Sequence, residues 1–425
     1  MRWRFRFTAK PSLSGIFAST PVVDEDTVYV QDLRSNVFAL DRTTGALRWA
    51  RRYRALNDGP NGLAVAGDRI YGATDSDAFS LDAATGRELW RRHLTSSSEQ
   101  LVDVAPIVWK GFVFLSTVGY PPSGRGAIYA LDALTGAVRW RFVTIEHPWR
   151  FAREAGGGGL WYPVSIDADG RLYGGNSNPA PWGGTPKRPN GGAFPGRARY
   201  TDSLLVLDAR TGRLLWQDQV TPHDIRDYDF QATPILTGSR VIGAGKAGLV
   251  IAWDRETRRR LWTARVGLHR NDVGPLPRHE VTICPGLLGG VETPMAYADG
   301  RVFVPVVDLC AKGSAVTAQS IDSVDPTRGT GLLVALDADT GRRLWLRRFP
   351  ASAFGCATVA NDVVFTATFD GRLHALSVRD GRELWHADLR AGANSCPAIA
   401  GDELFVGAGV PRPGSTEELV AFAPR

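Results

Sequence analysis

Short apolar runs alternate with tight polar turns along the whole chain, and one combination of the two recurs seven times. Its consensus is two apolar residues, Asp, two variable residues, Thr-Gly, three further residues and Trp. The copies end at Trp49, Trp90, Trp140, Trp216, Trp262, Trp345 and Trp385. Two copies depart from the consensus, because Arg258 replaces the glycine of the fifth and Ser377 replaces the aspartate of the seventh.

Each copy predicts a tight turn between two β-strands. The apolar run, for example residues 37–40, predicts a strand; the aspartate caps the turn through its side chain, and the glycine allows a positive φ. The tryptophan falls on the next strand, where its large apolar surface can pack between neighbouring sheets. Two more strand-like runs precede each copy. Four strands in a repeat of about 40 residues predict the blade of a β-propeller.

The two ends of the chain together predict one more blade. The run 418–422 has the pattern of a third strand, and residues 2–5 supply the missing fourth strand with Trp3. Pairing them would close the ring and remove open sheet edges. We therefore predict an all-β, eight-bladed propeller that forms a single domain over residues 1–425. The alternative is that the N-terminal residues are unstructured.

The repeat period is broken twice. Trp140 and Trp216 are 76 residues apart, and Trp262 and Trp345 are 83 residues apart. Relative to a repeat of about 40 residues, these intervals contain insertions of roughly 36 and 43 residues. The insertions, at about 146–200 and 265–330, are rich in Gly, Pro and aromatic residues. Long insertions in repeat proteins cluster on one face, which often binds ligands, so we expect them to form a funnel there.

Composition and charge narrow the range of functions. The chain is 44% hydrophobic with 47 glycines, which suits many short strands and turns. No apolar run reaches about 18 residues, so we expect no membrane span. The net charge is +6, but the basic residues are scattered, and the densest run is 258–260. A solvated surface is the better interpretation than nucleic-acid binding.

Four further motifs carry a family resemblance. In chain order they are Gly-Gly-Gly-Gly-Leu-Trp161, Gly175-Asn-Ser-Asn-Pro-Ala-Pro-Trp182, Thr221-Pro-His-Asp-Ile-Arg-Asp-Tyr228 and Gly245-Lys-Ala-Gly248. These motifs resemble segments of the PQQ-dependent quinoprotein alcohol dehydrogenases, and the tryptophan repeat resembles the repeat of the quinoprotein propeller. The resemblance covers nearly the whole chain.

The resemblance implies a role for one residue in each motif. Trp161 would be the aromatic floor under PQQ, and Asn178 would offer its amide oxygen to calcium or a lanthanide. Asp227 would be the general base that takes the proton of an alcohol, and it would also reach the metal. Lys246 would hydrogen-bond to the quinone oxygens. A flat cofactor suits an aromatic surface, and a nearby cation makes a quinone more electrophilic.

The sequence also departs from that family. The family has a metal-ligating glutamate where residues 116–126 contain no acid, and it has adjacent cysteines where residues 54–58 have none. Asn61 stands where the family has an arginine that meets a cofactor carboxylate. Glu292 falls near a position where the family often has an asparagine facing the cofactor. With Asn178 and Asp227, it would complete an oxygen-rich metal site.

Each candidate residue except Trp161 also has a structural interpretation. Asp227 lies in an acidic cluster that could cap turns, and Asn178 precedes a proline, as turn residues often do. Lys246 could lie at the surface, and Glu292 could be solvated in its Gly-rich loop. Trp161 follows four glycines and is poorly placed for core packing, which favours a ligand-facing position.

The four cysteines bear on the compartment. Cys284, Cys310, Cys356 and Cys396 form no CxxC or CxxCH motif, so zinc and covalent haem are unsupported. The 284/310 spacing resembles a disulfide of the quinoprotein dehydrogenases. Cys356 and Cys396 occupy equivalent positions in consecutive blades, which could lie on neighbouring inner strands. Two disulfides would place the protein outside the cell or in the periplasm; four buried thiols in a cytosolic protein are the alternative.

The leading hypothesis is a quinoprotein-like oxidoreductase that oxidises an alcohol or aldehyde and passes electrons to a separate acceptor. One alternative is a non-catalytic propeller of the same repeat that acts as a scaffold or binds partners. Another is a propeller enzyme repurposed for a different ligand. The long Gly- and Trp-rich insertions favour an enzyme, since scaffolds usually lack them.

Overall fold

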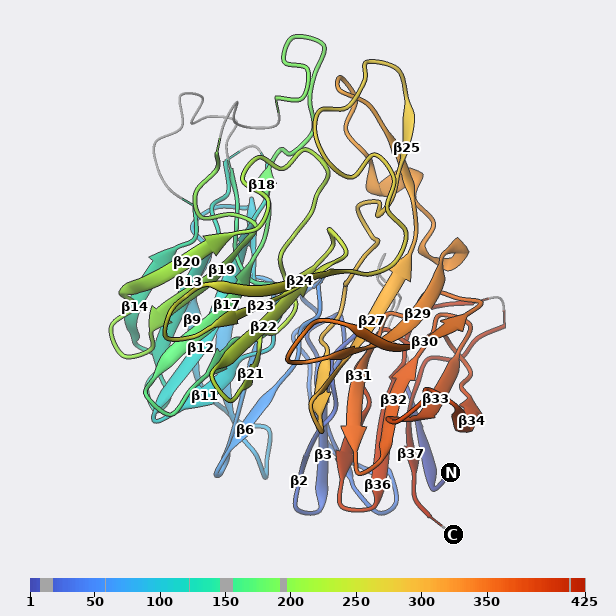
Figure 1. Ribbon diagram of the computed structural model, residues 1–425. Coiled ribbons are helices and arrows are strands. Elements are labelled where there is room, and N and C mark those ends of the chain that lie inside the picture. The colour runs from blue at the N-terminus through green and yellow to red at the C-terminus, as the bar shows by residue number, and fades with distance from the viewer. Residues whose placement is uncertain are drawn as a thin grey trace.

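The computed structural model describes residues 1–7, 18–57, 59–121, 123–145, 156–191, 197–412 and 414–424. It is an all-β propeller of eight blades, as the sequence predicts, and each blade is an antiparallel sheet of four main strands (Figure 1). Apolar clusters fill the spaces between successive blades. For example, Val250 of the fifth blade and Val304 of the sixth belong to one buried cluster.

The first four blades run in chain order. Blade 1 contains β2 (Val22–Asp24), β3 (Thr27–Gln31), β4 (Val37–Asp41) and β5 (Leu47–Arg51). Blade 2 contains β6 (Ala64–Ala66), β7 (Arg69–Ala73), β8 (Asp77–Asp82) and β9 (Glu88–His93). Blade 3 contains β11 (Ile107–Trp109), β12 (Phe112–Gly119), β13 (Ala127–Asp132) and β14 (Val138–Val143), and β10 (Gln100–Leu101) also pairs with β12. Blade 4 contains β16 (Ser165–Ile166), β17 (Arg171–Asn176), β19 (Ser203–Asp208) and β20 (Leu214–Gln219).

The remaining blades continue around the ring. Blade 5 contains β21 (Ile235–Thr237), β22 (Arg240–Gly245), β23 (Leu249–Asp254) and β24 (Arg260–Arg265). Blade 6 contains β26 (Ala296–Ala298), β27 (Arg301–Asp308), β29 (Thr330–Asp337) and β30 (Arg343–Phe349). Blade 7 contains β31 (Gly355–Ala360), β32 (Val363–Ala367), β33 (Arg372–Ser377) and β34 (Glu383–Asp388). Blade 8 contains β35 (Ala398–Ala400), β36 (Glu403–Ala408), β37 (Glu418–Phe422) and β1 (Trp3–Arg6).

The N-terminal strand closes the ring, as predicted. Strand β1 pairs antiparallel with β37, with Trp3 opposite Ala421 and Arg6 opposite Glu418. The two termini consequently lie side by side (Figure 1). Arg4 forms an ion pair with Glu418, whose side chain is buried. The closure therefore joins the ends of the chain by both a strand ladder and a partly buried charge pair.

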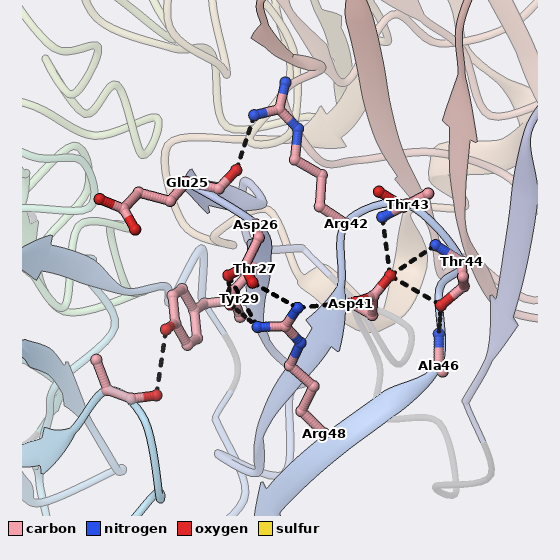
Figure 2. Close-up of polar contacts among 11 residues, drawn as sticks. Glu25, Asp26, Thr27, Tyr29, Asp41, Arg42, Thr43, Thr44, Ala46 and Arg48 are labelled. Carbon is pink, nitrogen blue, oxygen red and sulfur yellow. Dashed lines mark hydrogen bonds and ion pairs between the residues drawn. The ribbon is translucent and has the colours of Figure 1, made fainter.

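The repeated turn has the geometry that its sequence predicts. In blade 1, Asp41 Oδ1 accepts hydrogen bonds from the backbone N–H of Thr43 (3.0 Å) and Thr44 (2.8 Å) and from the Thr44 hydroxyl (2.9 Å) (Figure 2). Arg48 bridges Asp41 Oδ2 and Asp26 Oδ2, at 2.8 Å each. The aspartate therefore satisfies the turn backbone while its second oxygen binds the neighbouring strand.

The repeated tryptophan joins each blade to the next. The indole N–H of Trp49 donates to the Ala83 carbonyl in the turn of blade 2, at 3.0 Å. A Cβ on Gly86, in the same turn, would lie 2.5 Å from the Trp49 ring. The turn glycine is thus required both by its φ of +69° and by the ring packed against it. Five other tryptophans make the equivalent hydrogen bond: Trp3, Trp90, Trp140, Trp262 and Trp345.

The two remaining repeat tryptophans face irregular partners. By the same order around the ring, Trp216 meets the turn that carries Arg258, and Trp385 meets blade 8, where no such turn joins β37 to β1. Within the described ranges neither indole makes the inter-blade hydrogen bond, and Trp385 is 41% exposed. The docking of a tryptophan therefore depends on the turn of the following blade.

The described parts of both insertions lie at one end of the propeller, where β18 and β25 appear at the top of Figure 1. The first insertion forms a short sheet of β15 (Gly156–Gly157) and β18 (Pro179–Ala180). The second pairs β25 (Val281–Ile283) with β28 (Ala311–Gly313), followed by the 3₁₀ turns η1 (Ile321–Ser323) and η2 (Pro326–Arg328). Asn190 donates to the Leu276 carbonyl at 3.0 Å and accepts from the Leu276 N–H at 2.8 Å, so the insertions contact each other.

Two disulfides form, Cys284–Cys310 and Cys356–Cys396. The first ties the second insertion together beside β25 and β28. The second joins β31 of blade 7 to the segment before β35 of blade 8, as the equivalent positions of the two cysteines suggest. Residues 146–155 and 192–196 of the first predicted insertion lie outside the described residues. No helix among the residues that the structure describes is long and apolar enough to cross a membrane.

Candidate functional site

The candidate residues come from loops of blades 4 and 5 and from the second insertion. Asn178 lies between β17 and β18, and Asp227 lies in the connection from β20 to β21. Lys246 directly follows β22, and Glu292 lies between β25 and β26. All four side chains are buried. Direct contacts join Asn178, Asp227 and Lys246; Trp161 and Glu292 make no hydrogen bond to these three in the described part of the chain.

Lys246 is the centre of the site. Its Nζ lies 2.9 Å from Asp227 Oδ2 and 2.6 Å from Asp229 Oδ2. Burial alone would lower the pKa of Lys246, but the charges of Asp227, Asp229 and Glu292 together raise that pKa well above its usual value. The side chain is therefore a buried ammonium held between two carboxylates.

Asn178 completes a closed network. Its side-chain N–H donates to Asp227 Oδ1 at 2.6 Å, and its backbone N–H donates to Asp229 Oδ1 at 2.8 Å. Each aspartate thus binds Asn178 through one oxygen and Lys246 through the other. Every carboxylate oxygen of this pair has a donor, which is what buried carboxylates require.

The Asp227 carboxyl is held in an unusual position and environment. Its φ of +67° lies in the left-handed region that few residues other than glycine adopt. Burial raises the pKa of Asp227, Lys246 opposes this effect, and the like charges of Asp229 and Asp224 add to it. A strained backbone and a raised pKa occur together mainly at sites where the surrounding structure holds a functional group in place.

Asp224 caps a turn, which was the structural interpretation of Asp227 in the sequence. Its Oδ1 accepts from the Arg226 N–H at 2.9 Å, and its Oδ2 accepts from the Tyr228 N–H at 2.7 Å. Asp224 therefore caps the loop, whereas Asp227 and Asp229 face Lys246. Sequence reasoning did not select Asp229. The available signal was its place in the same acidic cluster, two residues after Asp227.

Glu292 is buried and only partly satisfied. Gln231 donates to its Oε2 at 2.9 Å and to its backbone carbonyl at 2.8 Å. Oε1 has no hydrogen-bond partner among the described residues. Burial raises the pKa of Glu292 to about 8, with Lys246 and Gln231 opposing the shift. The group is thus largely a neutral acid at pH 7, so it can donate a hydrogen bond as well as accept one.

Trp161 follows a glycine run that has very little free space. Gly157, Gly158 and Gly159 all have positive φ, and a Cβ on Gly159 would lie 2.3 Å from the Thr117 carbonyl. The glycine run therefore allows the loop to approach β12 closely. The Trp161 ring is half-buried and meets Tyr120 edge-on, with centroids 6.3 Å apart.

Several buried donors near these residues have no partner within the described ranges. They are the indole N–H groups of Trp161 and Trp182 and the hydroxyls of Ser177 and Thr293. Ser177 precedes Asn178 in the chain, and Thr293 follows Glu292. With the Lys246 ammonium, these are donors of the kind that an oxygen-rich, anionic cofactor such as PQQ would need. An unsatisfied buried donor is costly, which makes a bound acceptor the natural complement.

The same residues do not fit a calcium or lanthanide ion. Asn178 turns its N–H toward Asp227, and Lys246 already occupies the space between the two aspartates. Burial and the charges of Asp224, Asp229 and Asp227 raise the pKa of Asp202 well above its usual value, which disfavours a further charged ligand there. Among the residues that the structure describes, no three His, Cys, Asp or Glu side chains are grouped to hold a metal. The expected set of Asn178, Asp227 and Glu292 is not assembled as ligands.

Comparison with known families identifies the propeller. The model described as the β-propeller domain of glucose/ethanol/alcohol dehydrogenases matches residues 99–265, and the model described as outer membrane protein assembly factor BamB matches residues 1–150 and 285–425. The chain belongs to the PQQ-type β-propeller family. The part that matches the dehydrogenase model of this family contains Trp161, Asn178, Asp227 and Lys246.

Curated relatives in this family are alcohol dehydrogenases. Quinohemoprotein alcohol dehydrogenase ADH IIB of Pseudomonas putida is 31% identical over 264 residues, which cover 55% of this chain and 37% of the relative. Quinohemoprotein alcohol dehydrogenase of Comamonas testosteroni is 27% identical over 434 residues, covering 84% and 61%. The chain therefore spans only about a third to three-fifths of these relatives.

Solved structures share the fold. A quinohemoprotein alcohol dehydrogenase, ADHIIG from Pseudomonas putida HK5, superposes with a TM-score of 0.84 at 20% identity, covering 99% of this chain and 75% of that one. A europium-containing methanol dehydrogenase gives 0.81 at 21% identity, covering 99% and 92%. BamB from Moraxella catarrhalis gives 0.60 at 15% identity, covering 98% and 97%.

Proposed function

We propose that the chain is a quinoprotein-like oxidoreductase that oxidises an alcohol or aldehyde. The observation that carries this proposal is the buried Asp227–Lys246 pair, located in the segment that matches the dehydrogenase model. A base and a cation held together away from water are the two groups that oxidation of an alcohol by a quinone requires. Relatives that cover much of this chain are alcohol dehydrogenases, which supports the same reaction class.

Asp227 is the proposed general base. Its raised pKa makes it a stronger proton acceptor than an ordinary aspartate, and Lys246 opposes the effect of burial on this pKa. Asn178 holds Oδ1 at 2.6 Å and Lys246 holds Oδ2 at 2.9 Å, so the carboxylate is oriented from both sides. An oriented base removes the hydroxyl proton of a bound alcohol without first reorganising.

Lys246 and Trp161 are the proposed cofactor contacts. PQQ, when bound, supplies the group that accepts the hydride of the alcohol. The Lys246 ammonium would donate to oxygens that gain negative charge, and Trp161 would offer an aromatic face. The unpartnered donors on Ser177 and Thr293 would bind further oxygens, and Glu292 would donate as a neutral acid.

Two further features belong to the proposal. The disulfides Cys284–Cys310 and Cys356–Cys396 indicate an oxidising compartment, such as the periplasm or the extracellular space. A separate electron acceptor would reoxidise the cofactor.

A non-catalytic role is the second candidate. The BamB model matches most of the repeats outside the site-bearing segment, and BamB itself has the same propeller fold. Asn61 binds the Asp32 carbonyl at 2.8 Å through its Nδ2, so this position offers no cationic partner to a cofactor carboxylate. On this alternative the site network would only stabilise the propeller.

The test is turnover of the protein after loading with PQQ. Primary alcohols and aldehydes of increasing chain length are supplied with an artificial electron acceptor, and reduction of the acceptor is followed by absorbance. The proposal expects turnover with at least one substrate class. PQQ binding without turnover on any substrate supports a repurposed propeller, and failure to bind PQQ supports the non-catalytic role.

A further inference from the structure

The Lys246 ammonium lies between Asp227 and Asp229, the two carboxylates of the site, and its backbone is held on both sides. Its N–H donates to the Asp229 carbonyl at 2.9 Å. A Cβ on Gly245 would lie 2.1 Å from that same carbonyl, and a Cβ on Gly290 would lie 2.1 Å from the Lys246 carbonyl. The start of the side chain is therefore held between the Asp229 segment and the second insertion. The ammonium itself is held by Asp227 and Asp229, at 2.9 and 2.6 Å, so moving it aside would break two buried charge pairs.

The charge of the site is already compensated. Lys246 Nζ binds one oxygen of Asp227 and one of Asp229, and Asn178 donates to the other oxygen of each. A divalent cation placed among these oxygens would meet the buried ammonium at short range. It would also need Asn178 to reverse its amide. Both changes oppose the binding of a metal.

The segment that would supply a further ligand has other contacts. Residues 116–121, 123 and 124 present no carboxylate, and Tyr120 places its ring edge-on to Trp161 at 6.3 Å. The Tyr120 hydroxyl donates to Asp103 Oδ2 at 3.2 Å. The described part of this segment therefore offers no carboxylate, whereas a hard cation needs several oxygen ligands.

We propose that Lys246 takes the place of the divalent cation, so that the site holds its quinone without calcium or a lanthanide. The quinone in this inference rests on the proposed function. The role of the Lys246 ammonium as an internal cation does not, because it can be tested in the cofactor-free protein. Lys246 would pair with Asp227 and Asp229 and donate to the quinone oxygens. The acidic pair would bind metal only after the ammonium is removed.

The first experiment measures metal binding by the cofactor-free protein. Terbium(III), whose luminescence is sensitised by nearby aromatic side chains, is titrated into chelator-treated wild type, Lys246→Met, Lys246→Gln and the exposed control Lys187→Met. Wild type and the control are expected to bind weakly. At least one folded Lys246 variant is expected to bind at least tenfold more tightly, because Asp227 and Asp229 then lack their cation. Tight stoichiometric binding by wild type, or no gain in either folded variant, overturns the proposal.

The second experiment measures PQQ binding by wild type in EDTA, in calcium and in lanthanum, by tryptophan fluorescence and visible absorbance. The dissociation constant is expected to agree within about threefold across the three conditions. Binding at least tenfold tighter with either metal overturns the proposal. Absence of PQQ binding under all conditions contradicts the proposed function instead, and the terbium titration then still decides whether Lys246 is the internal cation.

Discussion

The Lys246 ammonium lies closer to Asp229 Oδ2, at 2.6 Å, than to Asp227 Oδ2, at 2.9 Å. Asp229 is 1% exposed and also accepts the backbone N–H of Asn178 at 2.8 Å. The residue that holds the lysine most tightly is thus the more deeply buried aspartate. This arrangement leaves Asp227 as the more accessible of the two carboxylates.

Asp229→Asn should destabilise the protein, because a buried ammonium would lose one of its two carboxylates. We expect a loss of about 2–4 kcal/mol in the free energy of unfolding, measured by urea denaturation at pH 7. The control is Asp388→Asn, whose exposed pairing with Arg372 should be worth less than about 1 kcal/mol. Equal effects of the two substitutions on the free energy of unfolding would show that the buried pairing stabilises the protein no more than the exposed one.

The inter-blade packing of tryptophan on the turn glycine gives a second prediction. Gly86→Ala places a Cβ 2.5 Å from the Trp49 ring at a φ of +69°, so it combines strain with a clash. We expect a loss of about 2–4 kcal/mol. Gly67→Ala is the matched control, since φ is +61° there but no atom lies within 4 Å. It should cost only about 1 kcal/mol in the same thermal or urea unfolding experiment.

Replacing Arg258 in the turn of blade 5 should raise the stability of the protein. Arg258 has a φ of +63° at the position where blades 1–4, 6 and 7 have glycine. Arg258→Gly should relieve this strain and allow the inter-blade contact of Trp216, raising stability by about 1 kcal/mol. Arg259→Gly removes the same side chain next to it without relieving a positive φ, so it should lower stability by about 0.5–1 kcal/mol. A fall in melting temperature for Arg258→Gly would contradict the assignment of strain.

The buried Glu292 should make stability depend on pH. Its folded pKa of about 8 exceeds the ordinary value of 4.5, so the folded state retains a proton that the unfolded state loses. The contribution of this group to stability therefore falls as pH rises from about 4.5 to about 8. The charged or polar groups acting on Glu292 are Lys246, Gln231, Asp229 and Asp227.

Glu292→Gln keeps the shape of the side chain and removes its titratable proton. At pH 9 it should be more stable than wild type by about 2–4 kcal/mol, with little difference at pH 4.5. The measurement is urea unfolding at both values, with the exposed Glu256→Gln as the control. A difference between wild type and Glu292→Gln that is the same at both pH values would show that Glu292 titrates normally in the folded state.

The architecture could be predicted from the sequence because the same side-chain contacts recur in each repeat. Each Asp, Gly and Trp acts within one turn and on the next blade, so their spacing alone indicates the propeller and its closure through Trp3. The contacts of Asp229 and Gln231 were not predicted, because they join loops of different blades. That Lys246 binds two carboxylates rather than one depends on the close approach of its backbone to the Asp229 segment and Gly290, which no local pattern encodes.

The most direct test of the proposed function is single-turnover reduction of bound quinone. Wild type, Asp227→Asn and the exposed control Asp169→Asn are loaded with PQQ and mixed rapidly with an alcohol that wild type oxidises, and the absorbance of the bound cofactor is followed. Wild type and Asp169→Asn should reduce the cofactor at the same rate, and Asp227→Asn should be slower by about 100-fold or more. Equal rates for wild type and Asp227→Asn would contradict the assignment of Asp227 as the base.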